Sequence, residues 1–182
     1  MKGVVFTEFL EMVETKFGLE TVNEIIEQSE LKSEGIYTSI GTYDFSEMQS
    51  LIGSLSTHTS IPVDDLIYVY GEYFFNYLIS THPKIFEHYK SPAHFLKSVE
   101  GHIHVQVRKI YPDAELPTFE VSEVTDNIME MTYSSPRALY KFAEALIVKT
   151  FAFYKHKITI SFNKLKKDGT LVKFTITHNG KQ

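Results

Sequence analysis

Apolar residues in the first half of the chain recur at intervals of three and four positions, which is the spacing of one face of an α-helix. Gly18 ends the first such pattern, because glycine readily closes a helix. Asp44 or Ser46 could cap a later helix, and Pro62 can open the next one. The predicted helices span residues 4–17, 19–28, 44–55 and 62–80, and the last is apolar on most of its circumference, as a deeply buried helix would be.

Residues 91–112 fit two patterns at once. Apolar residues at helical spacing predict a helix that Ser91 and Pro92 open. Ile103, Val105 and Val107 also alternate as they would along a strand, so both structures stay open for this segment. The helical stripe consists of Phe95, Val99, Ile103, Val107 and Ile110.

Beyond Pro112 the apolar residues alternate with polar ones, which is the period of a β-strand. A hairpin of residues 118–124 and 128–133, a helix over 136–156 and a second hairpin of residues 157–165 and 171–179 are predicted. Helices followed by strands in hairpins favour an α+β fold with a four-stranded antiparallel sheet over a parallel doubly wound one.

Composition narrows the functional classes. The chain has 182 residues, a net charge of −5 and a pI near 5.9, so it lacks the basic surface typical of nucleic-acid binding. It has no cysteine, which excludes disulfides, thiolate metal ligands and thiol catalysis. No apolar run reaches the length of a membrane span, and glutamates interrupt the apolar residues at the start. We therefore expect one compact cytoplasmic domain, residues 1–182, with neither nucleic acid nor membrane as a partner.

The stretch YSSPR, residues 133–137, lies where the second predicted strand meets the long helix. Ser135 followed by Pro136 could be the cap and first turn of that helix, with Arg137 exposed to solvent. Alternatively, Tyr133, Ser135 and Arg137 project to the same side of an extended segment, where all three could bind one carboxylate or phosphate. The spacing permits both interpretations, and they are not mutually exclusive.

Of the eight histidines, His102 and His104 stand out because they lie in an otherwise apolar stretch. On a helix they would point about 200° apart, so at most one of them can face a cofactor. A single imidazole facing an apolar cavity suits haem better than zinc, which usually takes three or four protein ligands. The aromatic helices could form the pocket, and Tyr133, Ser135 and Arg137 could bind the two propionates.

These residues also resemble a known family, the haem nitric oxide and oxygen binding (H-NOX) domains, which are relatives of the haem domain of soluble guanylate cyclase. The resemblance covers essentially the whole chain. It rests on the Tyr-x-Ser-x-Arg motif at residues 133–137, on the segment IHVQVRKIYP at residues 103–112, and on the start MKGVVF. His104 precedes the motif tyrosine by 29 residues, which is the spacing expected between iron ligand and motif.

The resemblance implies that haem b binds between a distal helical subdomain, about residues 1–63, and a proximal subdomain, residues 64–182, which carries the sheet. It also implies that His104 is the iron ligand and that Tyr133, Ser135 and Arg137 hold the propionates. Pro117 would press on the porphyrin and distort it. Six further side chains would line the distal side of the haem: Val5, Phe9, Phe74, Leu78, Phe142 and Leu146.

The function implied by the resemblance is that of a gas sensor and not of an enzyme. Nitric oxide, with carbon monoxide as an alternative, would bind ferrous haem and release His104. A separate signalling protein, such as a histidine kinase or a cyclic-di-GMP enzyme, would carry the output. A haem peroxidase would need distal acid–base groups, which the apolar set lacks. A haem-free module that binds a lipid or a peptide in the same cavity is the other alternative, and it would show no Soret band after haem is added.

Nitric oxide with exclusion of oxygen is the expected selectivity, because bound oxygen gains from a nearby hydrogen-bond donor. In oxygen-binding members of the family a distal tyrosine provides that donor. The corresponding position here, nine residues after Tyr133, is Phe142. Tyr140, Tyr73 and Tyr77 are the phenols that could still enter the pocket.

Overall fold

The computed structural model of the protein describes residues 1–178, and four helices make up its N-terminal part. They span Gly3–Phe17 (α1), Leu19–Glu27 (α2), Phe45–Thr59 (α3) and Val63–Thr81 (α4). All four were predicted, although α3 continues past Leu55. Gly18 closes α1 with a φ of 92°, a value that is strained for other residues. Asp44 precedes α3, but its carboxylate pairs with Lys32 at 2.7 Å and does not cap the helix.

The segment from Pro83 to Ile110 is helical with one irregular turn. It contains α5 (Pro83–Glu87), which the sequence pattern did not predict, α6 (Pro92–Ser98), the single π-helical turn η1 (Val99–Ile103) and α7 (His104–Ile110). Ser91 caps α6, because its hydroxyl accepts a hydrogen bond from the backbone N–H of His94 at 3.3 Å. The helical interpretation of residues 91–112 is therefore confirmed, and the strand interpretation is wrong.

The sheet is antiparallel throughout, with the strand order β1-β2-β4-β3. Its strands are β1 (Thr118–Thr125), β2 (Ile128–Ser134), β3 (Ile158–Lys164) and β4 (Leu171–His178), and α8 (Tyr140–Phe153) packs against it. Both predicted hairpins and the α+β fold class are confirmed. Asn179, the last residue of the predicted fourth strand, lies outside the described residues.

The helix predicted from Pro136 begins later, at Tyr140, and ends at Phe153. Ala138 has a φ of 53°, which a continuous right-handed helix cannot contain. The Ser135 hydroxyl accepts a hydrogen bond from the backbone N–H of Arg137 at 3.2 Å, within a turn ahead of the helix. Ser135 therefore caps a turn, and the prediction that it caps the long helix is wrong.

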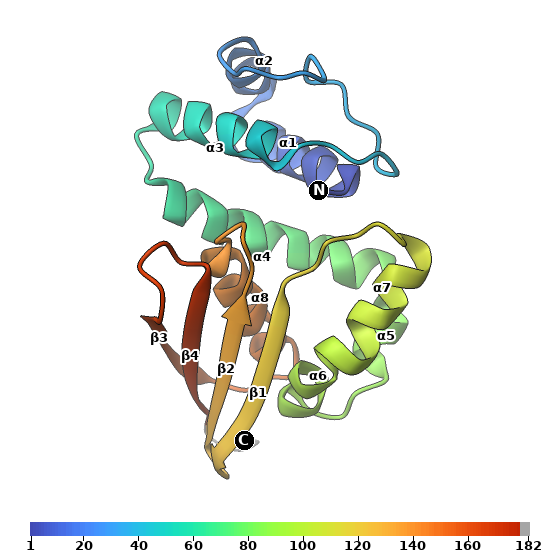
Figure 1. Cartoon of the computed structure of the whole chain (residues 1–182), viewed down its shortest axis with the longest axis vertical. Helices are drawn as coiled ribbons and strands as arrows, with labels where there is room; N and C mark the ends of the chain where they lie inside the picture. The colour runs from blue at the N-terminus through green and yellow to red at the C-terminus, as the bar shows by residue number, and fades with distance from the viewer. Residues whose placement is uncertain (179–182) are drawn as a thin grey trace.

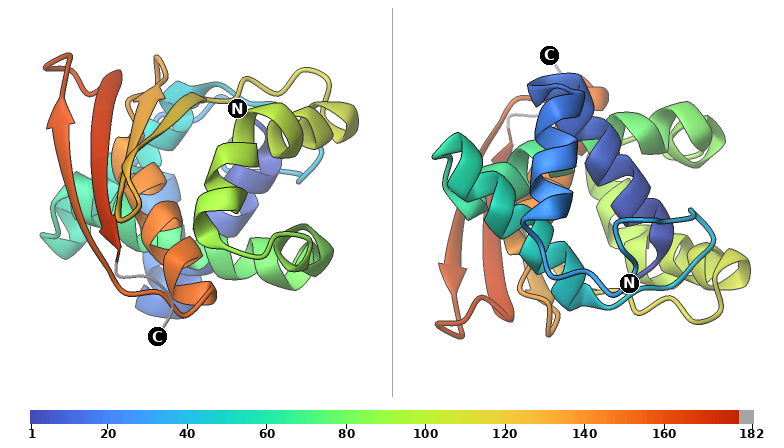
Figure 2. Two further views of the ribbon diagram at one scale, coloured as in Figure 1. Left: turned by 90° about the horizontal axis from the view of Figure 1, so that it is seen from below. Right: turned by 90° about the horizontal axis from the view of Figure 1, so that it is seen from above.

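Two hydrophobic cores meet along α4. In Figure 1, α1–α3 lie above α4, while the sheet, α8 and α5–α7 lie below it. Leu66 and Tyr70 belong to the core shared with α1–α3, whereas Phe75 belongs to the core formed with the sheet and α8. Figure 2 shows the sheet and α5–α7 on opposite sides of α8. None of the helices within residues 1–178 has the length and apolar character that a membrane crossing requires.

A buried carboxylate fixes the long connection between α2 and α3. Glu47 is 4% exposed and accepts hydrogen bonds from the hydroxyls of Tyr37, at 2.8 Å, and Ser33. The same connection holds the start of α1, because the carbonyl of Gly41 accepts a hydrogen bond from the backbone N–H of Gly3 at 2.8 Å. Glu47 therefore helps to place the first residues of the chain.

We expect Glu47→Gln to lower the free energy of unfolding by about 1–3 kcal/mol, because it weakens hydrogen bonds to a buried charged group. Urea unfolding followed by circular dichroism measures this change. The control is Glu27→Gln on the exposed side of α2, which should stay within about 0.5 kcal/mol of the original chain. Equal stability of the two variants would contradict an anchoring role for Glu47.

Candidate functional site

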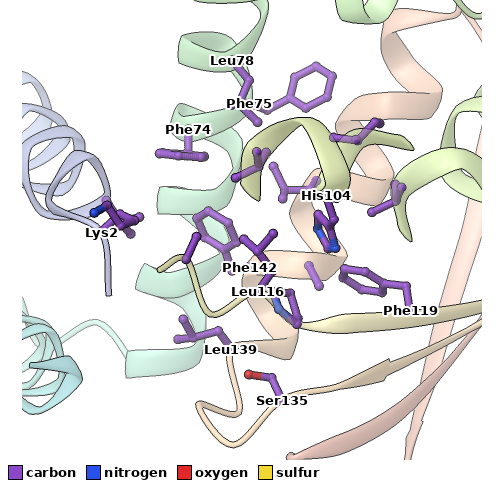
Figure 3. Close-up of a pocket in the computed structure, with 18 of the residues that line it drawn as sticks. Lys2, Phe74, Phe75, Leu78, His104, Leu116, Phe119, Ser135, Leu139 and Phe142 are labelled. Carbon is purple, nitrogen blue, oxygen red and sulfur yellow. The ribbon is translucent and has the colours of Figure 1, made fainter. Parts of the chain in front are cut away.

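A predominantly apolar cavity of about 370 Å³ lies between α4, α7, α8 and the sheet. Figure 3 shows the imidazole of His104 beside Phe119, with the rings of Phe74 and Phe142 across the cavity. Every residue of the helical stripe predicted for residues 91–112 lies on the wall of this cavity. The amphipathic pattern of that segment therefore faces the cavity.

His104 is held in a defined orientation at the start of α7. Its side chain is buried, and its Nδ1 lies 2.8 Å from Oε1 of Glu100, one helical turn earlier. That carboxylate oxygen also accepts a hydrogen bond from the backbone N–H of Phe119 at 3.1 Å. Among residues 1–178, Nε2 has no hydrogen-bond partner, so it is the ring nitrogen free to bind a ligand in the cavity.

Burial lowers the pKa of His104, although the charge of Glu100 and its hydrogen bond act in the opposite direction. Desolvation disfavours the imidazolium form, and a metal ligand must be neutral. The imidazole is thus kept in the state that coordination requires, and Glu100 fixes the tautomer that leaves Nε2 unprotonated.

His102 lies outside the cavity wall and is exposed. Its Nδ1 forms a hydrogen bond with the hydroxyl of Tyr89, and its ring packs near that of His88. The two histidines therefore have separate surroundings, in keeping with the opposite directions expected from helical geometry. Within residues 1–178 no cluster of three or more histidine and carboxylate side chains could hold a metal ion.

The Tyr-x-Ser-x-Arg residues line the same cavity as His104. Burial raises the pKa of Tyr133, so its phenol remains a hydrogen-bond donor. The side chain of Arg137 is 12% exposed, and its guanidinium contacts Glu115 through both the carboxylate and the carbonyl oxygen, the latter at 2.7 Å from Nη1. All three residues therefore line one cavity, although residues 136 and 137 lie in a turn and not in the extended segment that the second interpretation assumed.

Most of the predicted distal residues lie on the cavity wall, and Phe9 does not. Phe9 is fully buried in the core of α1–α3, where its ring packs edge to face against Tyr70 at 5.3 Å. It therefore supports the wall from behind. The predicted residues on the wall are Val5, Phe74, Leu78, Pro117, Phe142 and Leu146.

The sequence patterns did not indicate two residues of the site, Tyr70 on the cavity wall and Glu100 beside His104. Tyr70 lines the cavity, one helical turn before Phe74, and its hydroxyl donates a hydrogen bond to the carbonyl of Val5 at 2.6 Å. Burial raises the pKa of Tyr70 well above the usual value, so this phenol stays protonated. Glu100 was missed as well. Tyr70 lies four residues before Phe74 and Glu100 four residues before His104, and on a predicted helix this spacing places each pair on one face. That spacing was the signal that could have indicated both residues.

The other tyrosines differ in their position relative to the cavity. The hydroxyl of Tyr140 donates a hydrogen bond to Asp64 at 2.5 Å, and neither Tyr140 nor Tyr73 lines the cavity. Tyr77 lies on the wall. Burial raises the pKa of Tyr77, so it remains a neutral phenol.

These features define a class of protein. An apolar cavity with one buried imidazole on its wall and an arginine, a serine and a tyrosine at its edge fits haem, because haem combines an apolar ring, an iron that binds imidazole and two carboxylates. His104 is also prepared to bind a ligand, because Glu100 holds Nδ1 and leaves Nε2 available. The chain is therefore built as a haem-binding domain.

Comparison with known proteins gives the family. The sequence model of a protein family described as Haem-NO-binding matches residues 2–162. The chain belongs to this family. Haem is the cofactor of these domains, and they act as gas sensors. Among curated protein sequences none matches the chain.

Several solved structures are similar over the full length. An Fe(II) unliganded H-NOX protein from K. algicida is 53% identical, with a TM-score of 0.95 over 100% of this chain and 98% of that chain. The IWP-051-bound H-NOX from Shewanella woodyi in the Fe(II)CO state is 39% identical, with a TM-score of 0.84 over 100% and 97%. An H-NOX protein from S. oneidensis in the Fe(II)NO state is 26% identical, with a TM-score of 0.90 over 99% and 100%.

We expect His104→Gly to remove the Soret band of the purified protein, or to retain it only when imidazole is added, because the substitution removes the one buried imidazole on the cavity wall. Absorbance spectra of both forms with and without imidazole measure this. The matched control is His102→Gly, which changes a neighbouring exposed histidine and should leave the spectrum unchanged. The reverse pattern would show that His102 is the ligand.

Proposed function

We propose that this chain senses nitric oxide at ferrous haem, with His104 as the only protein ligand to the iron. The observation that supports this most directly is the orientation of His104. Glu100, itself held by the backbone N–H of Phe119, binds Nδ1 of the imidazole, and Nε2 of this cavity-lining ring has no hydrogen-bond partner among residues 1–178. A lipid or peptide module using the same cavity would have no need of such a buried, oriented histidine.

Tyr133, Ser135 and Arg137 would hold the propionates, and Pro117 would press on the porphyrin from the segment that follows α7. Bound haem supplies an iron atom at which a diatomic gas can bind. We propose that haem binds between two subdomains that meet near residue 63, and that α4 and α8 of the second subdomain contribute to the distal side together with the first. We base this on the wall, which combines α7 and the sheet on one side with the start of α1 and with α4 on the other.

Signalling is proposed to depend on release of His104 from the iron. His104 begins α7, and the π-helical turn η1 precedes it, so its ring is attached to a helix with an irregular and adaptable N-terminal turn. The Glu100 hydrogen bond would keep the released imidazole oriented. A separate protein, such as a histidine kinase or a cyclic-di-GMP enzyme, would read the resulting movement of α7.

We base the exclusion of oxygen on two side chains of the wall, Phe142 and Tyr70, and the phenol of Tyr77 is the remaining donor that the test below must include. Phe142 has no donor, and the Tyr70 hydroxyl is already committed to the carbonyl of Val5. A bound oxygen molecule would have to compete with a buried 2.6 Å hydrogen bond, whereas nitric oxide needs little such help. The predicted distal side chains on the wall are apolar and supply none of the acid–base groups that a peroxidase requires.

We expect the reduced, haem-loaded protein to bind nitric oxide and to form no stable oxygen complex in air. Anaerobic titration with nitric oxide, followed by exposure of a separate reduced sample to air, tests this by absorbance. Tyr70→Phe should leave both results unchanged, because its hydroxyl is withheld from the ligand. Tyr77→Phe is the companion variant, since Tyr77 also lies on the wall. A long-lived oxygen complex that either substitution abolishes would contradict exclusion of oxygen.

A further inference from the structure

The segment between α7 and β1, residues 111–117, crosses the edge of the cavity, and we call it the strap. It is tied to the rest of the molecule at two acidic side chains. Asp113 pairs with Lys2 at 3.1 Å and accepts a hydrogen bond from the hydroxyl of Thr42 at 2.8 Å, which joins the strap to the N-terminal helices. Glu115 contacts Arg137, which joins it to the turn after β2.

The two side chains of the Glu115–Arg137 contact differ in their exposure to solvent. The side chain of Arg137 is 12% exposed, whereas that of Glu115 is 81% exposed. Two atoms of Glu115 take part, since Nη2 pairs with the carboxylate and Nη1 donates to the carbonyl oxygen at 2.7 Å. A solvent-exposed carboxylate thus neutralises the one cation of the Tyr-x-Ser-x-Arg motif.

We propose that Glu115 is an internal counter-ion that competes with the haem propionates for Arg137 and thereby weakens haem retention. This inference rests on the proposed function. One guanidinium carries a single positive charge, and a propionate and Glu115 are two anions that would share it. A propionate can pair fully with the guanidinium only if the carboxylate of Glu115 gives up part of its own contact with Arg137, so Glu115 opposes binding by competition for that one charge.

Glu115 can yield at little cost. An exposed ion pair contributes little to stability because water solvates the freed carboxylate. The carbonyl of Glu115 keeps its hydrogen bond to Nη1 when the side chain changes, and Asp113 keeps the strap attached to the N-terminal part. Replacement of Glu115 by glutamine therefore removes the charge and leaves the attachment of the strap, and with it the position of Pro117, in place.

The test measures transfer of haem from the full chain to an excess of apomyoglobin. Glu115→Gln should lose haem about two- to fivefold more slowly than the original chain, the range expected for an exposed ion pair. The matched control is Glu120→Gln, which removes the same charge from an exposed position of β1 where residues 1–178 offer no ion pair. It should lose haem at the original rate.

Two further experiments, one in an Arg137→Gln chain and one with a modified haem, test whether Glu115 acts by competition for Arg137. In a chain carrying Arg137→Gln, the further change Glu115→Gln should have no effect on haem loss. Haem dimethyl ester, which has no free propionate, should be lost at the same rate from Glu115→Gln and from the original chain. The proposal is overturned if Glu115→Gln changes the rate at which the ester is lost. It is also overturned if Glu115→Gln slows haem loss in the Arg137→Gln chain as much as it does in the original chain.

Failure of the two proposals can be told apart. Haem loss from Glu115→Gln that is as fast as or faster than from the original chain overturns the counter-ion alone. If Glu120→Gln slows haem loss as much as Glu115→Gln does, the cause is the net charge of the chain and the counter-ion proposal is overturned. An original chain that takes up no haem overturns the proposed function, and the role of Glu115 with it.

Discussion

The close contact between α4 and α8 is the constraint on which the rest of the structure depends. A Cβ atom on Gly71 would lie 2.7 Å from the Cβ of Ala145 and 2.9 Å from the carbonyl oxygen of Phe142, so a larger residue here would force the two helices to shift. Glycine at this position lets the two helices touch. The contact brings Phe74 and Phe142 together, with ring centroids 5.4 Å apart, and their rings form one wall of the cavity. Because α4 contributes to both cores, it also sets the distance between the N-terminal helices and the sheet.

The polar groups around the cavity are mostly committed to protein partners. The carbonyl of Val5 accepts a hydrogen bond from the Tyr70 hydroxyl, and Glu100 holds Nδ1 of His104. Buried polar groups without partners are costly, so these pairings stabilise the chain by itself. They also have a functional effect, since they leave one imidazole nitrogen available and withdraw a phenol from the distal side.

Periodicity was enough to predict most of the secondary structure, and it failed where local geometry interrupts a pattern. The strands and the first four helices follow from spacings of two and of three to four residues, which depend only on which face is buried. The helix after β2 was placed too early, because Ser135 and Pro136 look like a helix start while the left-handed conformation of Ala138 delays it. The π-helical turn before His104 has no sequence signal that we could identify. The short helix α5 was missed because five residues are too few to show a period.

The sequence by itself determined the chemistry of the site. It supplied a histidine within an apolar stripe, the Tyr-x-Ser-x-Arg motif and an apolar set of distal candidates, because such features depend on residue type and spacing along one segment. Only the tertiary structure decided which atoms are available. Phe9 lies behind Tyr70 and not on the wall, Glu100 selects the free nitrogen of His104, and Glu115 reaches Arg137 from the strap. The contacts of Phe9 and Glu115 join residues far apart in the chain, so helical and strand spacing carry no information about them. Glu100 and His104 are four residues apart, which made their contact possible on a helix, but only the structure shows that it is made.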